Sequence, residues 1–139
     1  MISNIDKTIV IAKELKVLLS EKSEIVLIDL LPPEHFGKVR IPNAKNVCVF
    51  FASFLNDFAV VVPDKLTPVV VYGSSIRSQD AAMALEKLDR AGYEQVSFLK
   101  GGLEAWRGAG YDIEGEVTDQ LDDPQTTVKL PDGQYTVDS

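Results

Sequence analysis

Short apolar runs alternate with amphipathic stretches along most of this chain. Continuous β-rich runs occur at Ile25–Asp29 and Val69–Tyr72, and shorter ones at Ile9–Ile11, Asn46–Val49 and Gln95–Leu99. Runs without polar alternation are typical of strands that are buried on both faces of a parallel sheet. The pattern therefore predicts a series of short buried strands.

The stretches between these runs show helical spacing. Ala12–Ser20 carries leucines three and four positions apart, Phe51–Phe58 is a short apolar segment, and a helix is expected from about Ser78 to the stop signal at Gly92. Strands and helices in alternation predict an α/β fold, with a mostly parallel central sheet flanked by helices on both faces. Ligands bind such sheets where the carboxyl ends of strands meet the starts of helices.

The turn after Val69–Tyr72 is the first candidate site. It reads Gly73, Ser74, Ser75, Ile76, Arg77, Ser78 and then enters a helix. A short Gly/Ser loop at a helix start directs backbone N–H groups and the positive helix end at one place, and the Arg77 guanidinium would reinforce the attraction. We expect this loop to bind a small anion such as sulfate, phosphate or thiosulfate.

The charge is uneven along the chain. Of the 139 residues, positions 1–111 hold 13 acidic and 13 basic side chains, so the net charge of −7 arises after Tyr111. This tail contains one basic residue, Lys129. Its acidic residues are Asp112, Glu114, Glu116, Asp119, Asp122, Asp123, Asp132 and Asp138. Without a basic stripe to neutralise phosphates, nucleic acid is not an expected partner.

These observations divide the chain into a domain at 1–111 and an acidic extension at 112–139. Residues 114–123 read as an exposed linker, with docking to a basic partner as the alternative. Alternation around the turn Pro131-Asp132-Gly133 predicts a β-hairpin over 127–137. Because a two-stranded hairpin is marginally stable alone, it is expected to pack on its own domain or on a second copy, giving a homodimer.

The chain contains one cysteine, Cys48, and no apolar stretch long enough to span a bilayer. The start of the chain lacks the pattern of a signal peptide, so a cytoplasmic protein without membrane contact is expected. One cysteine forms neither an internal disulfide nor a thiolate zinc cluster, and no metal or cofactor is predicted. We interpret Cys48 as a small buried hydrophobic residue, and the alternative is that it serves as a nucleophile.

Four blocks occur in order over about residues 5–111. They are Leu27-Ile28-Asp29 with Pro33-Glu34-His35-Phe36, the segment Arg40–Val47, Val69–Tyr72 followed by Arg77-Ser78, and Leu99–Trp106 with its Gly-Gly pair. With these blocks the chain resembles the rhodanese family of single-domain sulfurtransferases. In the second block Arg40 stands at the family's histidine and Asn43 at its glycine. The resemblance implies a rhodanese-like α/β fold.

The chain departs from the family at the position that carries its chemistry. The family holds sulfur as a persulfide on one loop cysteine, whereas here the equivalent residue is Gly73 if the strands are aligned, or Tyr72 if Arg77-Ser78 are aligned. Neither side chain supplies a reactive thiolate. The sequence therefore predicts a catalytically inactive rhodanese-like module for protein interaction or regulation with an unknown protein partner; the alternative is a sulfurtransferase that uses Cys48.

Other polar residues receive structural interpretations. Asp29, at the end of a buried strand, is expected to accept hydrogen bonds from a loop, and Arg40 to support the structure. The two loop serines lack a positioned base, since the one histidine, His35, lies in a different predicted loop. Trp106 is expected to anchor the last helix in the core.

Overall fold

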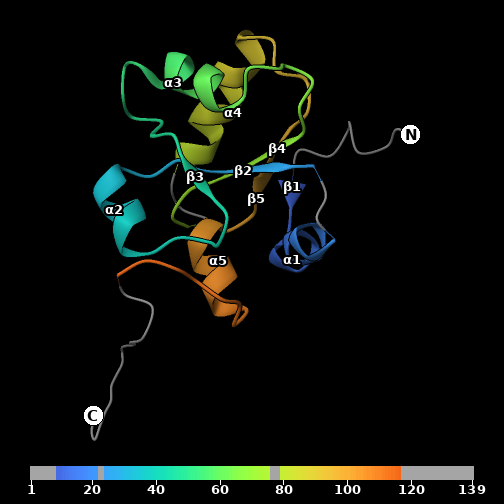
Figure 1. Cartoon of the computed structure of the whole chain (residues 1–139), viewed down its shortest axis with the longest axis vertical. Coiled ribbons are helices and arrows are strands. Elements are labelled where there is room, and N and C mark those ends of the chain that lie inside the picture. The colour runs from blue at the N-terminus through green and yellow to red at the C-terminus, as the bar shows by residue number, and fades with distance from the viewer. Residues whose placement is uncertain (1–8, 22–23, 76–78, 117–139) are drawn as a thin grey trace, which may run out of the picture.

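The computed structural model describes residues 9–21, 24–75 and 79–116 of the chain, and strands and helices alternate through them (Figure 1). The strands are β1 (Ile9–Val10), β2 (Val26–Asp29), β3 (Lys45–Asn46), β4 (Val69–Tyr72) and β5 (Val96–Leu99). The helices are α1 (Ala12–Ser20), α2 (Pro33–Lys38), α3 (Phe54–Val61), α4 (Asp80–Arg90) and α5 (Gly102–Gly108).

The five strands form one sheet in the order β1-β5-β4-β2-β3, and every pairing in it is parallel. The longest pairing joins β2 and β4, where Val26 lies opposite Val69 and Asp29 opposite Tyr72. The predicted parallel sheet is confirmed. Its two central strands end side by side, so the residues that follow them share one edge.

Alternate residues of the strands feed two separate cores. Ile28, Val69 and Val71 pack with side chains of α3 and α4 on one face of the sheet. Leu27, Val70 and Tyr72 pack with side chains of α1 and α5 on the other face. Figure 1 shows the same layers, with α3 and α4 above the strands and α1 and α5 below them. The prediction of helices on both faces is confirmed.

Several boundaries differ from those predicted. The strand expected at 46–49 pairs as β3 only at Lys45–Asn46, because the chain then turns while Val47 and Val49 still donate hydrogen bonds to carbonyls of residues 29 and 30. The helix expected at 51–58 begins later, at Phe54. The segment after β2, interpreted as a loop, is helix α2. Pro33 begins that helix, where a missing N–H costs nothing.

The packed domain extends past Tyr111. The Trp106 indole donates to the carbonyl of Asp112 at 2.7 Å, and Glu116 donates its N–H to Gly37 at 3.2 Å. Glu114, which was predicted to start an exposed linker, is exposed but is tied to the domain by an antiparallel bridge with Arg40. The predicted hairpin at 127–137 and the remaining tail lie outside the described residues.

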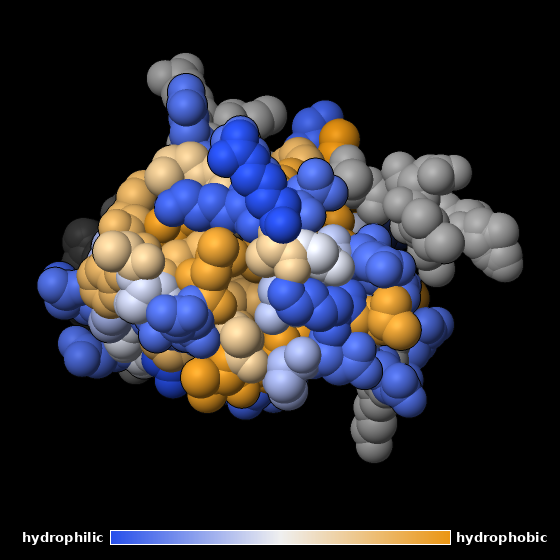
Figure 2. Space-filling model, turned by 90° about the horizontal axis from the view of Figure 1, so that it is seen from above, coloured by the Kyte–Doolittle hydropathy of each residue, from blue (hydrophilic) through white to orange (hydrophobic). Residues whose placement is uncertain are grey.

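Exposed apolar side chains gather on the face that carries α3. Phe50 and Phe51 lie in the turn before this helix, Leu55 and Val60 on it, and Leu66 in the following loop; their exposed fractions range from 39% to 81%. Figure 2 views the molecule from this side and shows apolar surface broken by charged residues. Within the described residues, no helix has the length and apolar character needed to cross a membrane.

Candidate functional site

The loop after β4 begins at Gly73. Tyr72 is the last residue of the strand, lies opposite Asp29 in the register and is fully buried. Gly73 is therefore the first loop residue, followed by the half-buried Ser74 and Ser75. The other predicted loop residues, Ile76, Arg77 and Ser78, lie outside the described residues.

Helix α5 holds this loop by its first turn. The N–H of Leu103 donates to the carbonyl of Gly73, and the N–H of Glu104 to the carbonyl of Ser74, both at 2.9 Å. Because N–H and C=O point in opposite directions across a trans peptide, the N–H groups of Ser74 and Ser75 point away from α5. The loop is thus fixed with its carbonyls on one side and its amides on the other.

The glycine pair before α5 makes this contact close. Gly102 has φ +58°, and a Cβ there would lie 2.4 Å from the carbonyl oxygen of Gly73. Gly101 has φ +78°, in the left-handed region that favours glycine. The Gly-Gly pair therefore serves backbone packing between α5 and the loop.

Asp80 is a residue of this site that was not predicted from the sequence. It is the first residue of α4 and is only 2% exposed. A Cβ on Gly73 would lie 2.4 Å from its Cγ, 2.4 Å from Oδ1 and 2.6 Å from Oδ2, so the carboxylate lies directly against the α-carbon of Gly73. The available signal was an aspartate in the first turn of the helix that follows the loop.

Asp29 and Tyr72 form a buried polar pair at the same sheet edge. The Tyr72 hydroxyl donates to Asp29 Oδ2 at 2.7 Å and accepts from the N–H of Ile41 at 3.1 Å. The N–H of Leu31 donates to Asp29 Oδ1 at 2.8 Å. Asp29 therefore accepts a hydrogen bond from the segment after its own strand, as predicted.

Burial dominates the electrostatics of this pair. It raises the pKa of Asp29, while the hydrogen bonds from Tyr72 and Leu31 oppose the rise and the negative charge of Asp80 adds to it. Burial also raises the pKa of Tyr72, and the neighbouring Asp29 carboxylate adds to that effect. Tyr72 is thus held as a neutral hydrogen-bond donor.

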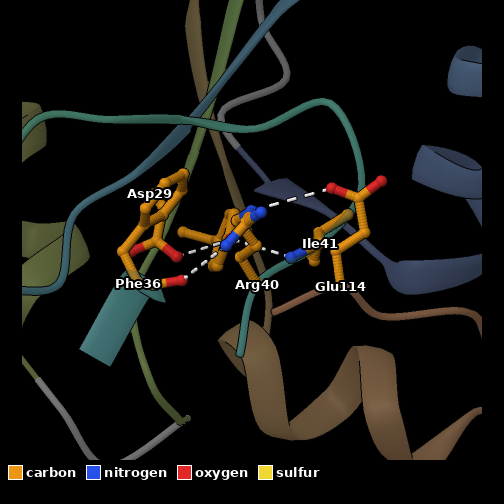
Figure 3. Close-up of polar contacts among 6 residues, drawn as sticks. Asp29, Phe36, Arg40, Ile41 and Glu114 are labelled. Carbon is orange, nitrogen blue, oxygen red and sulfur yellow. Dashed lines mark hydrogen bonds and ion pairs between the residues drawn. The ribbon is translucent and has the colours of Figure 1, made fainter. Parts of the chain in front are cut away.

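The Arg40 side chain joins helix α2 to Glu114. Its Nη1 donates to the carbonyl of Phe36 at 3.1 Å and its guanidinium stacks 4.9 Å from the centre of that ring. Its Nε lies 3.6 Å from Oε1 of Glu114, so Arg40 lies between the two residues (Figure 3). Nearby, Asn43 adopts φ +73°, a conformation in which Asn is one of the few residues that replaces glycine readily.

The chain that carries this loop and its Gly-Gly helix start is similar to known proteins. Residues 11–109 match the rhodanese-like domain family. The chain belongs to that family. The match covers most of the chain and includes the loop, Asp80 and the Gly-Gly pair.

Curated relatives of this rhodanese-like domain are longer proteins. It is 28% identical over 105 residues to Adenylyltransferase and sulfurtransferase MOCS3 of Arabidopsis thaliana, covering 68% of this chain and 23% of that protein. It is 31% identical over 110 residues to the uncharacterized protein slr1261 of Synechocystis, covering 79% of this chain and 58% of that protein. The chain thus spans about a quarter to somewhat over half of their lengths.

Solved structures show the same rhodanese-like fold. The solution structure of the rhodanese-like domain of Alr3790 from Anabaena superposes with a TM-score of 0.69 at 25% identity, covering 94% of this chain and 98% of that one. Thiosulfate sulfurtransferase from Pseudomonas aeruginosa gives 0.67 at 23% identity, covering 82% of this chain and 21% of that one.

The remaining candidates of this rhodanese-like domain are dispersed. Cys48 is a free thiol, 3% exposed, just after β3, and β2 separates that strand from β4. His35 is exposed on α2, and Trp106 is buried in the core, as predicted.

A hollow of about 530 Å³ is lined by Pro42 and by residues 111–114, which contact Arg40 through Glu114. Among the described residues, no group of three or more His, Cys, Asp or Glu is arranged to hold a metal ion.

Proposed function

We propose that this rhodanese-like domain does not carry out cysteine-based sulfur transfer and acts as a protein-interaction or regulatory module. The loop after β4 is where the family's persulfide-bearing cysteine is expected, and this chain has none between Val69 and Arg90. Because Tyr72 is a buried strand residue bonded to Asp29, Gly73 is the better equivalent of the cysteine. A glycine offers no nucleophile.

The observation that carries this proposal is the burial of the one thiol in the chain. A cysteine that receives sulfur must meet its donor as an accessible thiolate. Cys48 is 3% exposed and flanked by the buried Val47 and Val49. Two similar proteins are named as sulfurtransferases, MOCS3 and the Pseudomonas enzyme, and this gives the alternative of a relocated Cys48 its support. The burial of Cys48 weighs against that alternative.

The interaction half of the proposal rests on the apolar surface around α3. Phe50, Phe51 and Val60 expose 55%, 46% and 81% of their area. Exposed apolar residues that lie together on one face are a feature of protein-binding surfaces. This face is opposite to the one packed by α1 and α5, so a partner here would leave those helices free.

The activity half is tested by thiocyanate formation from thiosulfate and cyanide. Purified protein is compared with its Cys48→Ala variant, and an active rhodanese serves as the positive control. The proposal expects no turnover above the buffer blank for either protein. Turnover that is lost in Cys48→Ala would overturn it and establish the alternative.

The interaction half is tested by crosslinking capture with matched surface variants. Phe51→Ser and Val60→Ser change the α3 face, and Val17→Ser is the control, because Val17 is a similarly exposed apolar residue on α1. We expect a captured partner to be lost with the first two variants and retained with the third. Equal capture by all three would exclude this face.

A further inference from the structure

A buried carboxylate from the start of α4 lies against Gly73, the first residue of the loop where an anion was predicted. Asp80 is 2% exposed, begins α4, and contacts Gly73 so closely that a Cβ at position 73 would lie 2.4–2.6 Å from its carboxyl group, which would have to shift to admit a side chain. The backbone does not impose this glycine, since Gly73 is not among the glycines with positive φ. The space taken by Asp80, and not the backbone conformation, therefore disfavours a side chain at position 73.

The position of Asp80 also suits an anion electrically. A carboxylate in the first turn of a helix is stabilised by the unpaired N–H groups and the positive end of the helix dipole. These are the features that make a helix start attractive to sulfate or phosphate. Asp80 therefore competes with any external anion for the start of α4.

A second buried carboxylate lies close by. Asp29 is fully buried at the end of β2, and the charge of Asp80 contributes to the rise in its pKa. An external dianion entering beside Gly73 would approach both carboxylates. Like charges in a poorly solvated site repel strongly, so the site disfavours an added anion as it stands.

We propose that Asp80 is an internal anion that fills the site beside Gly73, replaces both the loop cysteine and its bound sulfur species, and excludes external oxyanions. This inference rests on the proposed function and stands against the predicted binding of a small anion at Gly73–Ser78; the titration below decides between the two. In this arrangement Asp80 and Gly73 together determine whether an anion or a sulfur species can bind beside the loop.

Anion titration tests the exclusion. Wild-type protein, Asp80→Ala and Asp89→Ala are titrated with sodium sulfate at constant ionic strength, and the backbone amides of Gly73–Ser75 are followed by NMR. Asp89 is an exposed acid on the same helix and controls for the loss of one carboxylate. We expect saturable shifts only in Asp80→Ala. Saturable shifts in wild type, or none in a folded Asp80→Ala, would overturn the inference.

Restoring the thiol tests the steric part. Gly73→Cys, Gly73→Cys/Asp80→Ala and Gly73→Cys/Asp89→Ala, all carrying Cys48→Ala, are incubated with thiosulfate and weighed by intact mass spectrometry. The thiolate attacks the outer sulfur of thiosulfate, the sulfur–sulfur bond breaks, and sulfite leaves with the electron pair. We expect sulfur to add to the Asp80→Ala combination at least about tenfold faster than to either of the other two variants.

These arms separate the two proposals. Equal sulfur addition to Gly73→Cys with and without Asp80 would overturn the role of Asp80 and leave the proposed function intact. Sulfur addition to wild type at Cys48 would instead overturn the proposed function. Circular dichroism confirms that each variant is folded before it is compared.

Discussion

Replacing Gly73 with alanine adds one methyl group to a site that Asp80 already fills. Where no clash occurs and φ is ordinary, Gly→Ala stabilises a protein by about 0.4–1 kcal/mol, because it lowers the conformational entropy of the unfolded chain. Here the new Cβ would lie 2.4–2.6 Å from three atoms of the Asp80 carboxylate. Overpacking of this kind costs about 1–3 kcal/mol, so we expect a net loss of about 1–2 kcal/mol.

Urea unfolding followed by circular dichroism measures this loss of free energy. In a thermal unfolding experiment on a chain of this size, the same loss should lower the melting temperature by about 3–6 °C. Gly37→Ala is the control, since a Cβ there meets no atom within 4 Å, and it should be neutral or slightly stabilising. In an Asp80→Ala background, Gly73→Ala should no longer lower the free energy of unfolding. The two substitutions should therefore show a coupling energy of at least about 1 kcal/mol. Equal costs in both backgrounds would show that Asp80 is not the group that the new methyl meets.

Three further variants test neighbouring parts of the site. Gly102→Ala combines φ +58° with a clash against the carbonyl of Gly73 and should lose about 2–5 kcal/mol in urea unfolding; a loss below about 1 kcal/mol would contradict the close contact. Asp29 has a pKa raised above 3.8, so its contribution to stability is full below that pH and declines as the pH rises through the raised pKa. The unfolding free energy of wild type relative to Asp29→Asn should fall over that range, and a constant difference would be inconsistent with a raised pKa. Glu114→Gln removes a partly exposed ion pair with Arg40 and should cost less than about 1 kcal/mol, a cost that high salt abolishes; an undiminished cost at high salt would point to packing instead.

Much of the fold was predictable because it depends on buried runs. Val69–Tyr72 and Ala12–Ser20 have the predicted bounds, since their apolar periodicity extends to both ends. Helix α2 was missed because it spans six residues, begins with Pro33 and buries none of its residues fully, which leaves little apolar periodicity to read. The shift of β3 has a similar origin: Val47–Val49 are buried, but the ladder ends before them.

The position of the loop after β4 was predictable from the sequence, and the residues that pack against it were less so. The loop after β4 follows from the general position of ligand sites at strand ends, and the role of Asp29 follows from its burial. Asp80 was missed because an acidic residue at a helix start usually reads as a solvated cap, and only packing reveals that it faces Gly73. The bridge between Arg40 and Glu114 joins residues far apart in sequence, where no local pattern predicts contact.

The most direct test of the central claim is the mass of the wild-type protein after incubation with excess thiosulfate. The account predicts an unchanged mass, because Gly73 offers no thiol and Cys48 is buried. Addition of one sulfur atom, absent in Cys48→Ala, would show that the chain holds a persulfide and would contradict the claim that it lacks cysteine-based sulfur transfer.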